Sequence, residues 1–334
     1  MGAFLLRRLL ALIAVAWGVS IMAFFIARVI PGDPAQIAAG LEAGPEQVQE
    51  LRRVMGLDKP VHVQYFVFLR GLLRGDFGVS LRTRRPVLED LARHLPATIE
   101  LTLVAMTLAL ATGIPLGVLA ATSRGKLTDT LIRFIAVSGI ALPVFWLALI
   151  VQLVFYGDLG WFPSGGRIGS GLTSPPTRTG LYLIDSLLAR DPTAFLSSFH
   201  HIILPAAVLA FGRWATIVRM TRVSLLEVLN HDYVRTARAK GLSNSRVILR
   251  HALRNAMIPV TTMVGLQVGF LLSGTVLVEW VFSWPGVGDY AVRSIVALDF
   301  SPIVAVATLL SVIFVLVNSL VDVVYHILDP RITT

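Results

Sequence analysis

The side chains best placed to act on a partner lie in one polar, cationic stretch, Asp232 to Ala256, between two long apolar runs. The Asp232 carboxylate can cap a short helix, and Gly241 can end that helix in the left-handed conformation that residues with a Cβ avoid. Ser243 or Asn244 can then cap a second helix, which leads into the next apolar run. We therefore expect a short helix lying flat at a membrane surface, followed by a helix that rises into the bilayer.

Patterns typical of catalytic and nucleotide-binding sites are missing from the sequence. The pattern G-x-x-x-x-G-K-[ST] does not occur, because Gly125-Lys126 is followed by Leu127 and has no glycine at the required earlier position. Neither H-E-x-x-H nor G-x-S-x-G occurs. The run from Ser164 to Gly171 has the glycines of a phosphate cradle but lacks the Gly-Lys-Ser/Thr order. We expect no catalytic residue and no cofactor in this chain.

A few polar residues lie inside apolar segments, where burying them costs free energy, so each has a structural or functional role. Arg213 lies well inside one such segment and must face protein or a water-filled path. It either lines a transport pathway or pairs structurally with a carbonyl or carboxylate group. Gln267 and Asn318 raise the same question, whereas Asp322 lies near the end of its segment. Arg213 and Gln267 are the candidates for lining a path.

One pair of histidines, His200-His201, could coordinate a metal ion. The pair falls at the outer end of an apolar segment, where an interfacial pair of imidazoles is the commoner outcome. We therefore predict no metal site.

The composition indicates an integral membrane protein. The chain is 55% hydrophobic and only 15% charged, with a mean hydropathy of +0.75, far outside the range of soluble globular proteins. The absence of cysteine excludes disulfides, thiol catalysis and thiolate metal sites. The net charge of +9 does not indicate nucleic acid, because most cations of the short loops fall on one side of the membrane.

Six apolar segments are long enough to cross about 30 Å of hydrocarbon at roughly 20 residues each. They lie near Leu9–Val29, Ala97–Ala121, Leu131–Tyr156, Ile202–Ser224, Met257–Val281 and Pro302–Ile327. Pro143 can kink the third segment, where neighbouring helices can satisfy the freed carbonyl groups. We predict an all-α polytopic membrane protein with six transmembrane helices.

The distribution of Lys and Arg in the short loops predicts the orientation of the chain. Leaving aside the long segment 30–96, one side holds Arg7, Arg8, Arg124, Lys126, Arg133, Arg235, Arg238, Lys240, Arg246, Arg250, Arg254 and Arg331, and the other holds Arg167, Arg178, Arg190 and Arg293. The richer side faces the cytoplasm, so we expect both termini and the cationic stretch inside. Arg219 and Arg222 can snorkel to the same interface.

The segments predicted to lie outside differ in regularity. After Pro45, Val48 and Leu51 share one helical face, and a similar periodicity returns from Tyr65 to Leu73, which predicts amphipathic helices on the membrane or on the bundle. They could receive a partner protein or serve as a lid. Residues 157–198, rich in Gly, Pro, Ser and Thr, predict a loop of low regularity. The organisation is thus an N-terminal transmembrane helix over 1–30, an external helical segment over 31–96, and a core of five spans over 97–334 with the cationic loop at 227–256.

Several short motifs together resemble the dipeptide/oligopeptide/nickel permease family of ATP-binding-cassette importers. They are Leu6-Arg-Arg-Leu9, Pro31-Gly-Asp-Pro-Ala35, Gly56-Leu-Asp-Lys-Pro60, Gly75-Asp-Phe-Gly78, Leu95-Pro-Ala-Thr98, Gly113-Ile-Pro-Leu-Gly117, Pro143-Val-Phe-Trp146, Asp232-Tyr-Val-Arg-Thr-Ala-Arg-Ala-Lys-Gly241, His251-Ala-Leu-Arg-Asn-Ala256, Pro285-Gly-Val-Gly288 and Asp329-Pro-Arg331. The cationic stretch looks like the EAA loop of such permeases. Thr236-Ala237-Arg238 replaces Glu-Ala-Ala and Leu253-Arg254 replaces a later Leu-Pro, as in the peptide/nickel branch.

The resemblance implies a type I importer permease that moves its substrate by alternating access. It implies four kinds of partner: a second, similar permease, two cytoplasmic ATPases that bind ATP, an external substrate-binding protein, and the lipid bilayer of the cell (inner) membrane. The short helix of the loop would dock on an ATPase. The residues implied in this coupling are Asp232, Tyr233, Arg235, Thr236, Ala237, Ala239, Lys240 and Gly241. The substrate that we predict is a di- or oligopeptide, with a nickel chelate or another small solute such as a sugar as the alternative.

Two other classes of protein remain as alternatives. An ion-driven secondary transporter would use intramembrane carboxylates and inverted repeats of broken helices. A membrane-embedded hydrolase would need a nucleophile and base, or a metal set, within the bilayer. The sequence shows no obvious repeat, no acidic residue deep in a span and no such catalytic set.

Overall fold

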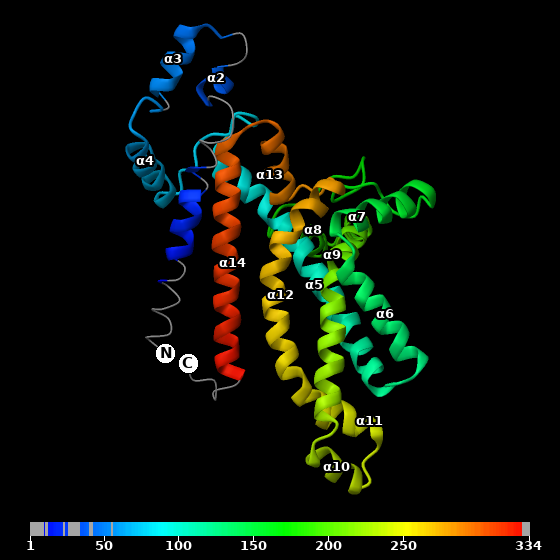
Figure 1. The fold of residues 1–334 in the computed structure, drawn as a ribbon. Coiled ribbons are helices and arrows are strands. Elements are labelled where there is room, and N and C mark those ends of the chain that lie inside the picture. The colour runs from blue at the N-terminus through cyan, green and yellow to red at the C-terminus, as the bar shows by residue number, and fades with distance from the viewer. Residues whose placement is uncertain are drawn as a thin grey trace. The chain divides into compact units, whose positions relative to one another are not determined.

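The structure is a computed structural model, and it describes residues 10, 13–22, 24–25, 34–39, 43–54 and 56–328. These residues form helices joined by turns (Figure 1), and within them we find one isolated β-bridge, Val79–Pro86, but no strand. Both termini lie outside the described residues, as do residues 26–33 and the motifs Leu6-Arg-Arg-Leu9 and Asp329-Pro-Arg331. The predicted sidedness of the termini therefore stays a prediction.

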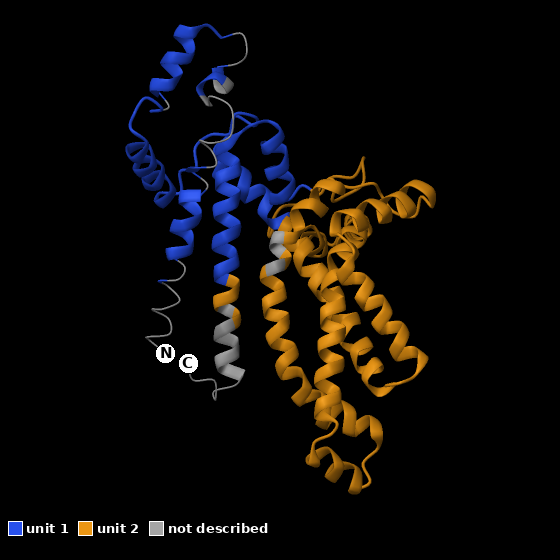
Figure 2. Ribbon diagram, viewed as in Figure 1, with its two compact units in different colours: residues 1–97, 285–316 blue, residues 98–284, 317–334 orange. Residues whose placement is uncertain are grey.

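The chain divides into two compact units (Figure 2). Unit 1 comprises residues 1–97 and 285–316, and unit 2 comprises residues 98–284 and 317–334. Two long helices, α5 (Val87–Thr122) and α14 (Phe300–Leu328), begin in unit 1 and continue into unit 2. Each unit has its own cluster of buried apolar side chains.

Unit 1 contains three short helices from the segment that was predicted to be helical and external. They are α2 (Pro34–Ala39), α3 (Pro45–Val54) and α4 (Val61–Leu73). Pro45 begins α3 because the first helical position needs no N–H donor. The prediction that these two stretches are helical is confirmed by α3 and α4, and neither helix has a buried residue. Whether they lie on the membrane or receive a partner stays a prediction.

The core of unit 1 joins the start of α5 to α13 (Val287–Val296) and α14. At its edge, the buried Asp299 accepts hydrogen bonds from the Ser80 hydroxyl at 2.6 Å and the Arg82 N–H at 3.2 Å. Asp90, also buried, accepts a hydrogen bond of 3.1 Å from the Tyr290 hydroxyl. Burial and the Asp90 carboxylate raise the pKa of Tyr290, so this hydroxyl remains a donor. These bonds fix the segment before α5 onto α13 and the turn that follows it.

In unit 2 the long helix α9 (Pro192–Val228) is central. Its neighbours are α6 (Leu127–Ala141), α7 (Val144–Gln152), α8 (Tyr182–Ala189) and α12 (Leu253–Val281). Half of the most apolar stretch of α9 is buried, against 33% of that of α5. The helix α9 is therefore the element on which the rest of unit 2 packs.

The number of membrane spans agrees only in part with the prediction. Three helices are long and apolar enough by themselves: α5, α9 and the Phe300–Ser319 part of α14. Two more spans are bent pairs, Leu127–Ala141 with Val144–Asp158 at 106°, and Asn244–Gly269 with Gly274–Val281 at 58°. The first predicted span lies only partly in the described residues, where Ile13–Met22 is helical. Six spans remain a prediction.

The third predicted span is not one helix, which corrects the prediction for Leu131–Tyr156. The chain turns by 106° at Leu142 and Pro143, and a π-helical turn, η1 (Leu153–Asp158), follows α7. A proline pushes the preceding residue out of the α region. Leu142 accordingly has extended dihedrals, φ −82° and ψ 130°. The predicted kink at Pro143 is thus confirmed as a full break.

The prediction of an irregular loop over 157–198 is also wrong in part. This stretch contains α8 and the first turns of α9, which starts at Pro192 rather than near Ile202. The Asp191 carboxylate accepts the N–H groups of Thr193 and Ala194, each at 3.0 Å. A capping Asp before a Pro at the first helical position is a strong start signal, which the interpretation from composition overlooked. Likewise α5 begins at Val87 rather than Ala97.

Candidate functional site

The cationic stretch forms a short helix and the beginning of a longer one. The short helix is α10 (Asp232–Ala239), and the longer one starts with α11 (Asn244–Arg246) and a π-helical turn, η2 (Val247–Ala252), before α12. The prediction of two helices is confirmed. Ser243 occupies the N-cap position of the second helix, but its side chain makes no capping hydrogen bond.

The Asp232 carboxylate does not cap α10, which corrects that prediction. His231 occupies the N-cap position, without a side-chain hydrogen bond, and Asp232 is the first helical residue. The Asp232 carboxylate instead lies 3.3 Å from Arg235, and both side chains are exposed. A carboxylate in the first turn still interacts favourably with the helix dipole.

Gly241 ends α10 as predicted. Its φ is +75°, in the left-handed region. The Gly241 N–H donates to the Arg238 carbonyl at 2.9 Å. A Cβ at this position would meet no atom within 4 Å. Glycine is therefore required by the backbone conformation and not by lack of space.

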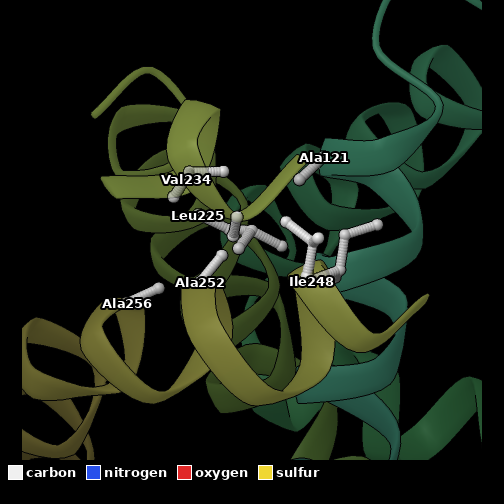
Figure 3. Close-up of a cluster of buried hydrophobic side chains, with 8 residues drawn as sticks. Ala121, Leu225, Val234, Ile248, Ala252 and Ala256 are labelled. Atoms are coloured by element: carbon white, nitrogen blue, oxygen red, sulfur yellow. The ribbon is translucent and has the colours of Figure 1, made fainter. Parts of the chain in front are cut away.

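The inner face of α10 is buried in an apolar cluster (Figure 3). Val234 and Ala237 enter it from α10, and the other buried members are Ala121, Leu225, Val247, Ile248, Ala252 and Ala256. These come from α5, α9, η2 and α12. Burying one valine contributes about 1.5–3 kcal/mol. The short helix thus shares one apolar cluster with four other elements.

The outer face of α10 carries most of the predicted coupling residues. The exposed ones are Asp232, Tyr233, Arg235, Thr236, Ala239, Lys240 and Gly241. Ala237 is only 8% exposed and belongs to the anchoring face. The Tyr233 hydroxyl accepts a 2.8 Å hydrogen bond from the Asn255 amide, which ties the outer face to α12. Asn255 belongs to one of the family motifs, but no pattern in the sequence indicated that it would bind Tyr233.

Arg222 has a side-chain partner within unit 2, and its snorkelling to the interface stays a prediction. Its guanidinium group donates two hydrogen bonds to Asp129, at 2.7 and 2.8 Å, and so joins α9 to the first turn of α6. The exposed Arg133 lies 3.4 Å from the same carboxylate.

The two residues predicted to line a path, Arg213 and Gln267, meet in unit 2. Arg213 Nη1 donates to Gln267 Oε1 at 2.8 Å. Arg213 also lines a cavity of about 390 Å³ together with Gly139, Ile140, Leu142, Val144, Leu209, Gly212, Thr216, Leu271, Gly274 and Leu277. The cavity lies between α6, α7, α9 and α12. The structure therefore brings the two path candidates together beside an open space.

The glycine-rich run from Ser164 to Gly171 is packed against the protein and holds a buried ion pair. A Cβ at Gly165 would lie 2.0 Å from the Phe282 carbonyl oxygen. Arg167 donates to Glu100 at 2.5 Å and to the Gly180 carbonyl at 2.9 Å. These contacts indicate that the run holds the loop between η1 and α8 in place within unit 2.

The histidine pair engages backbone carbonyls. His200 Nε2 lies 2.8 Å from the Trp161 carbonyl oxygen, and His201 Nδ1 lies 2.7 Å from that of Ser197. Among the described residues, no group of three or more His, Cys, Asp or Glu is arranged to hold a metal ion.

Two family models match this chain. Residues 113–334 match the inner membrane component of binding-protein-dependent transport systems, and residues 1–102 match the N-terminal part of such a membrane component. The chain belongs to this family. Its resemblance to importer permeases, first drawn from short motifs, is thereby confirmed.

Relatives of this permease chain are similar over nearly its whole length. A probable D,D-dipeptide transport system permease protein of Escherichia coli (strain K12) is 46% identical over 326 residues, which are 98% of this chain and 96% of the relative. A dipeptide transport system permease protein of Alkalihalophilus pseudofirmus is 44% identical over 332 residues, 99% of each chain. A glutathione transport system permease protein of Salmonella typhimurium is 40% identical over 329 residues, 98% of each.

A solved structure shares the fold of this permease chain. The inward-facing MetNI methionine ABC transporter matches with a TM-score of 0.52 and 16% identity, covering 72% of this chain and 96% of that chain. The predicted class, an all-α membrane protein with an ABC importer permease fold, is confirmed. Members of the family are membrane components and not enzymes themselves.

Proposed function

We propose that this chain is the translocating subunit of an ATP-driven peptide importer of the inner membrane. Its relatives are named for D,D-dipeptides, dipeptides, di/tripeptides and glutathione, and the similarity runs over nearly the whole chain. All of these are short peptides, which favours a peptide over a nickel chelate or a sugar as the substrate.

The observation that carries this proposal is the construction of α10. The helix has an inner face buried against four other elements and an outer face that is exposed and cationic. A force applied to the outer face would reach α5, α9 and α12 without bending α10 itself. That is what a coupling helix pushed by an ATPase requires.

The assembly would contain a second, homologous permease, two cytoplasmic ATPase subunits and an external substrate-binding protein. We place both termini and the loop at 227–256 in the cytoplasm and the helical segment 31–96 outside, with the five-span core over 97–334. The docking residues would be Asp232, Tyr233, Arg235, Thr236, Ala239 and Lys240, with Gly241 setting the end of the helix and Ala237 anchoring it. ATP would be bound and hydrolysed only by the partners.

Transport would proceed by alternating access. Closure of the two ATPases on ATP would bring the two coupling helices together and open the path outward. Hydrolysis would reverse the movement and release the peptide inward. The path would pass Arg213 and Gln267, the paired polar residues of the interior.

Purification of the complex in mild detergent tests this proposal. We expect a second permease and ATPases to co-purify, and we expect the reconstituted complex to take up a dipeptide only with ATP and the binding protein. An ion-driven secondary transporter is the alternative. It would purify alone and move solute in ATP-free vesicles, and either result would overturn the proposal.

A further inference from the structure

The cavity beside Arg213 lies where two membrane spans are interrupted. One wall is formed at the break between α6 and α7, by Leu142 and Val144, and another at the bend of α12, by Leu271 and Gly274. Interrupted helices are tolerated at membrane depth where they are covered by protein or line a cavity, and many transporters bind their substrates at such places. A volume of about 390 Å³ lies within the range of small-molecule sites.

The charge of Arg213 is not compensated within the described part of the chain. Its one hydrogen bond to a side chain goes to the neutral amide of Gln267, and none of the ion pairs found among the described residues includes it. Apart from Arg213 and Thr216, the residues that line the cavity are apolar or glycine. An arginine in such surroundings is costly unless an anion joins it.

A second source of positive potential faces the same cavity. Val144, the first residue of α7, lines it, and the N-cap residue Pro143 provides no side-chain acceptor for the first N–H groups. The first N–H groups of a helix have no partners within it, and its dipole favours negative charge at this end. The Arg213 guanidinium and the start of α7 thus converge on one space.

We propose that this cavity binds the C-terminal carboxylate of the transported peptide. Arg213 would form the ion pair, and Gln267 would hold the guanidinium group in position. This inference rests on the proposed function. All unmodified linear peptides share a C-terminal carboxylate whatever their side chains, so one cation can serve varied cargo. A carboxylate side chain of the second permease has the same chemistry and is the other possible source.

The absence of cysteine from the chain allows a direct test. In the complex reconstituted in vesicles, Thr216→Cys places a single thiol of this chain at the cavity. We would compare its rates of modification by an anionic and a cationic methanethiosulfonate reagent, with and without Arg213→Gln. We expect the ratio of the anionic to the cationic modification rate to fall about tenfold or more in the Arg213→Gln variant. A change of this size corresponds to the free energy of one hydrogen bond to a charged group.

Two controls accompany this comparison. Arg213→Lys should preserve most of the ratio, because it keeps the charge. Thr173→Cys, an exposed position in the loop before α8 that does not line the cavity, should show a rate ratio that does not change with the residue at position 213. If Arg213→Gln left the rate ratio of the Thr216→Cys variant unchanged, the inference would be overturned.

Peptide protection distinguishes the two sources of the carboxylate. We expect alanyl-alanine to slow the modification of the thiol at position 216 and its C-terminal amide to do so at least about tenfold less effectively. If the two compounds protected the thiol equally, or if neither protected it, Arg213 would not bind the peptide carboxylate. The anion would then be a carboxylate side chain of the second permease. ATP-dependent uptake of alanyl-alanine by the unmodified complex is measured separately. Its absence would contradict the proposed function, whereas uptake without amide discrimination contradicts only this inference.

Discussion

Arg222 holds Asp129 through two parallel hydrogen bonds, 2.7 Å from Nε and 2.8 Å from Nη2. The Asp129 side chain is 1% exposed and also accepts the Gly125 N–H at 3.4 Å. Paired bonds of this kind fix geometry as well as contribute free energy. Since Leu225, one turn further along α9, belongs to the cluster under α10, the pair extends the anchored block to α6. A displacement of α10 should therefore reach the broken span α6–α7.

Breaking this pair should uncouple transport from ATP hydrolysis. Asp129→Asn or Arg222→Gln should destabilise the chain by about 2–4 kcal/mol, because each leaves a partly buried charge without its partner. We expect the number of peptides imported per ATP to fall, and we expect the combined exchange Asp129→Arg with Arg222→Asp to restore part of it. The measurements are the thermal unfolding midpoint and parallel assays of uptake and ATPase activity.

Arg133→Gln is the matched control for that experiment. Arg133 touches the same carboxylate at 3.4 Å, but its side chain is 54% exposed. Exposed pairs of this kind contribute at most about 1 kcal/mol. If Arg133→Gln were as harmful as Arg222→Gln, the loss would come from reduced positive charge at this end of the helices and not from the paired geometry.

The anchoring of α10 predicts a local effect of substitutions on its inner face. Val234→Asp would bury a carboxylate in the apolar cluster, so we expect α10 to detach from α9 and η2. Ala239→Asp adds the same charge on the exposed face and should leave α10 in place. Trypsin should cut the loop, after Arg235, Arg238 or Lys240, about tenfold faster in the first variant than in the second. Equal cleavage rates would contradict the anchoring.

Local signals in the sequence predicted the elements but not most of the contacts between them. Pro143 and Gly241 act through the dihedral angles of their own neighbourhood, so their effects could be derived from residue type. Arg213 and Gln267 were each identified by the cost of a polar group in an apolar span. Their mutual hydrogen bond joins residues 54 positions apart, and no local pattern specifies such a pairing.

The same limit explains what was missed. The Asp129–Arg222 pair joins residues 93 positions apart, and the position of Arg222 near the end of its own span does not indicate this partner. No pattern of residue types in the sequence predicts the π-helical turn η2. Asp191, by contrast, lies before a proline and is a recognisable N-cap, but the Gly, Pro, Ser and Thr content of residues 157–198 favoured a loop there.

The left-handed conformation of Gly241 predicts a graded series of variants. Gly241→Ala should cost about 1 kcal/mol, because a Cβ is disfavoured at φ +75°, and should loosen the end of α10. Gly241→Asn should cost less, since Asn tolerates this conformation. Gly241→Asp differs from Gly241→Asn chiefly in charge, so the comparison of these two isolates the docking surface.

We expect the aspartate variant to weaken ATPase association more than the asparagine variant does. The measurement is the amount of ATPase that co-purifies with each variant, together with coupled uptake. If alanine and asparagine reduced uptake equally, the conformation at Gly241 would not be the reason for the glycine. If asparagine and aspartate associated equally well, α10 would not end inside the docking surface.

Asp185 should make the loop before α8 in unit 2 sensitive to acid. Its buried carboxylate accepts the N–H groups of Arg178, Thr179 and Gly180, at 3.2, 2.8 and 2.9 Å, and the Thr179 hydroxyl at 2.8 Å. Burial alone would raise the pKa of Asp185, but these hydrogen bonds together hold it below its usual value. A group whose pKa is lowered on folding stabilises the protein above its unfolded pKa, near 3.9 for Asp, and loses this contribution as the pH falls through the lower, folded value.

The difference in unfolding midpoint between the unaltered chain and Asp185→Asn isolates this contribution from the titration of other groups. We expect the difference to be constant from neutral pH down to about pH 5 and to shrink below about pH 4, because the unaltered chain loses its charged acceptor there while the amide does not titrate. A difference that stayed the same at every pH would mean that shape, and not the charge of Asp185, organises residues 178–180.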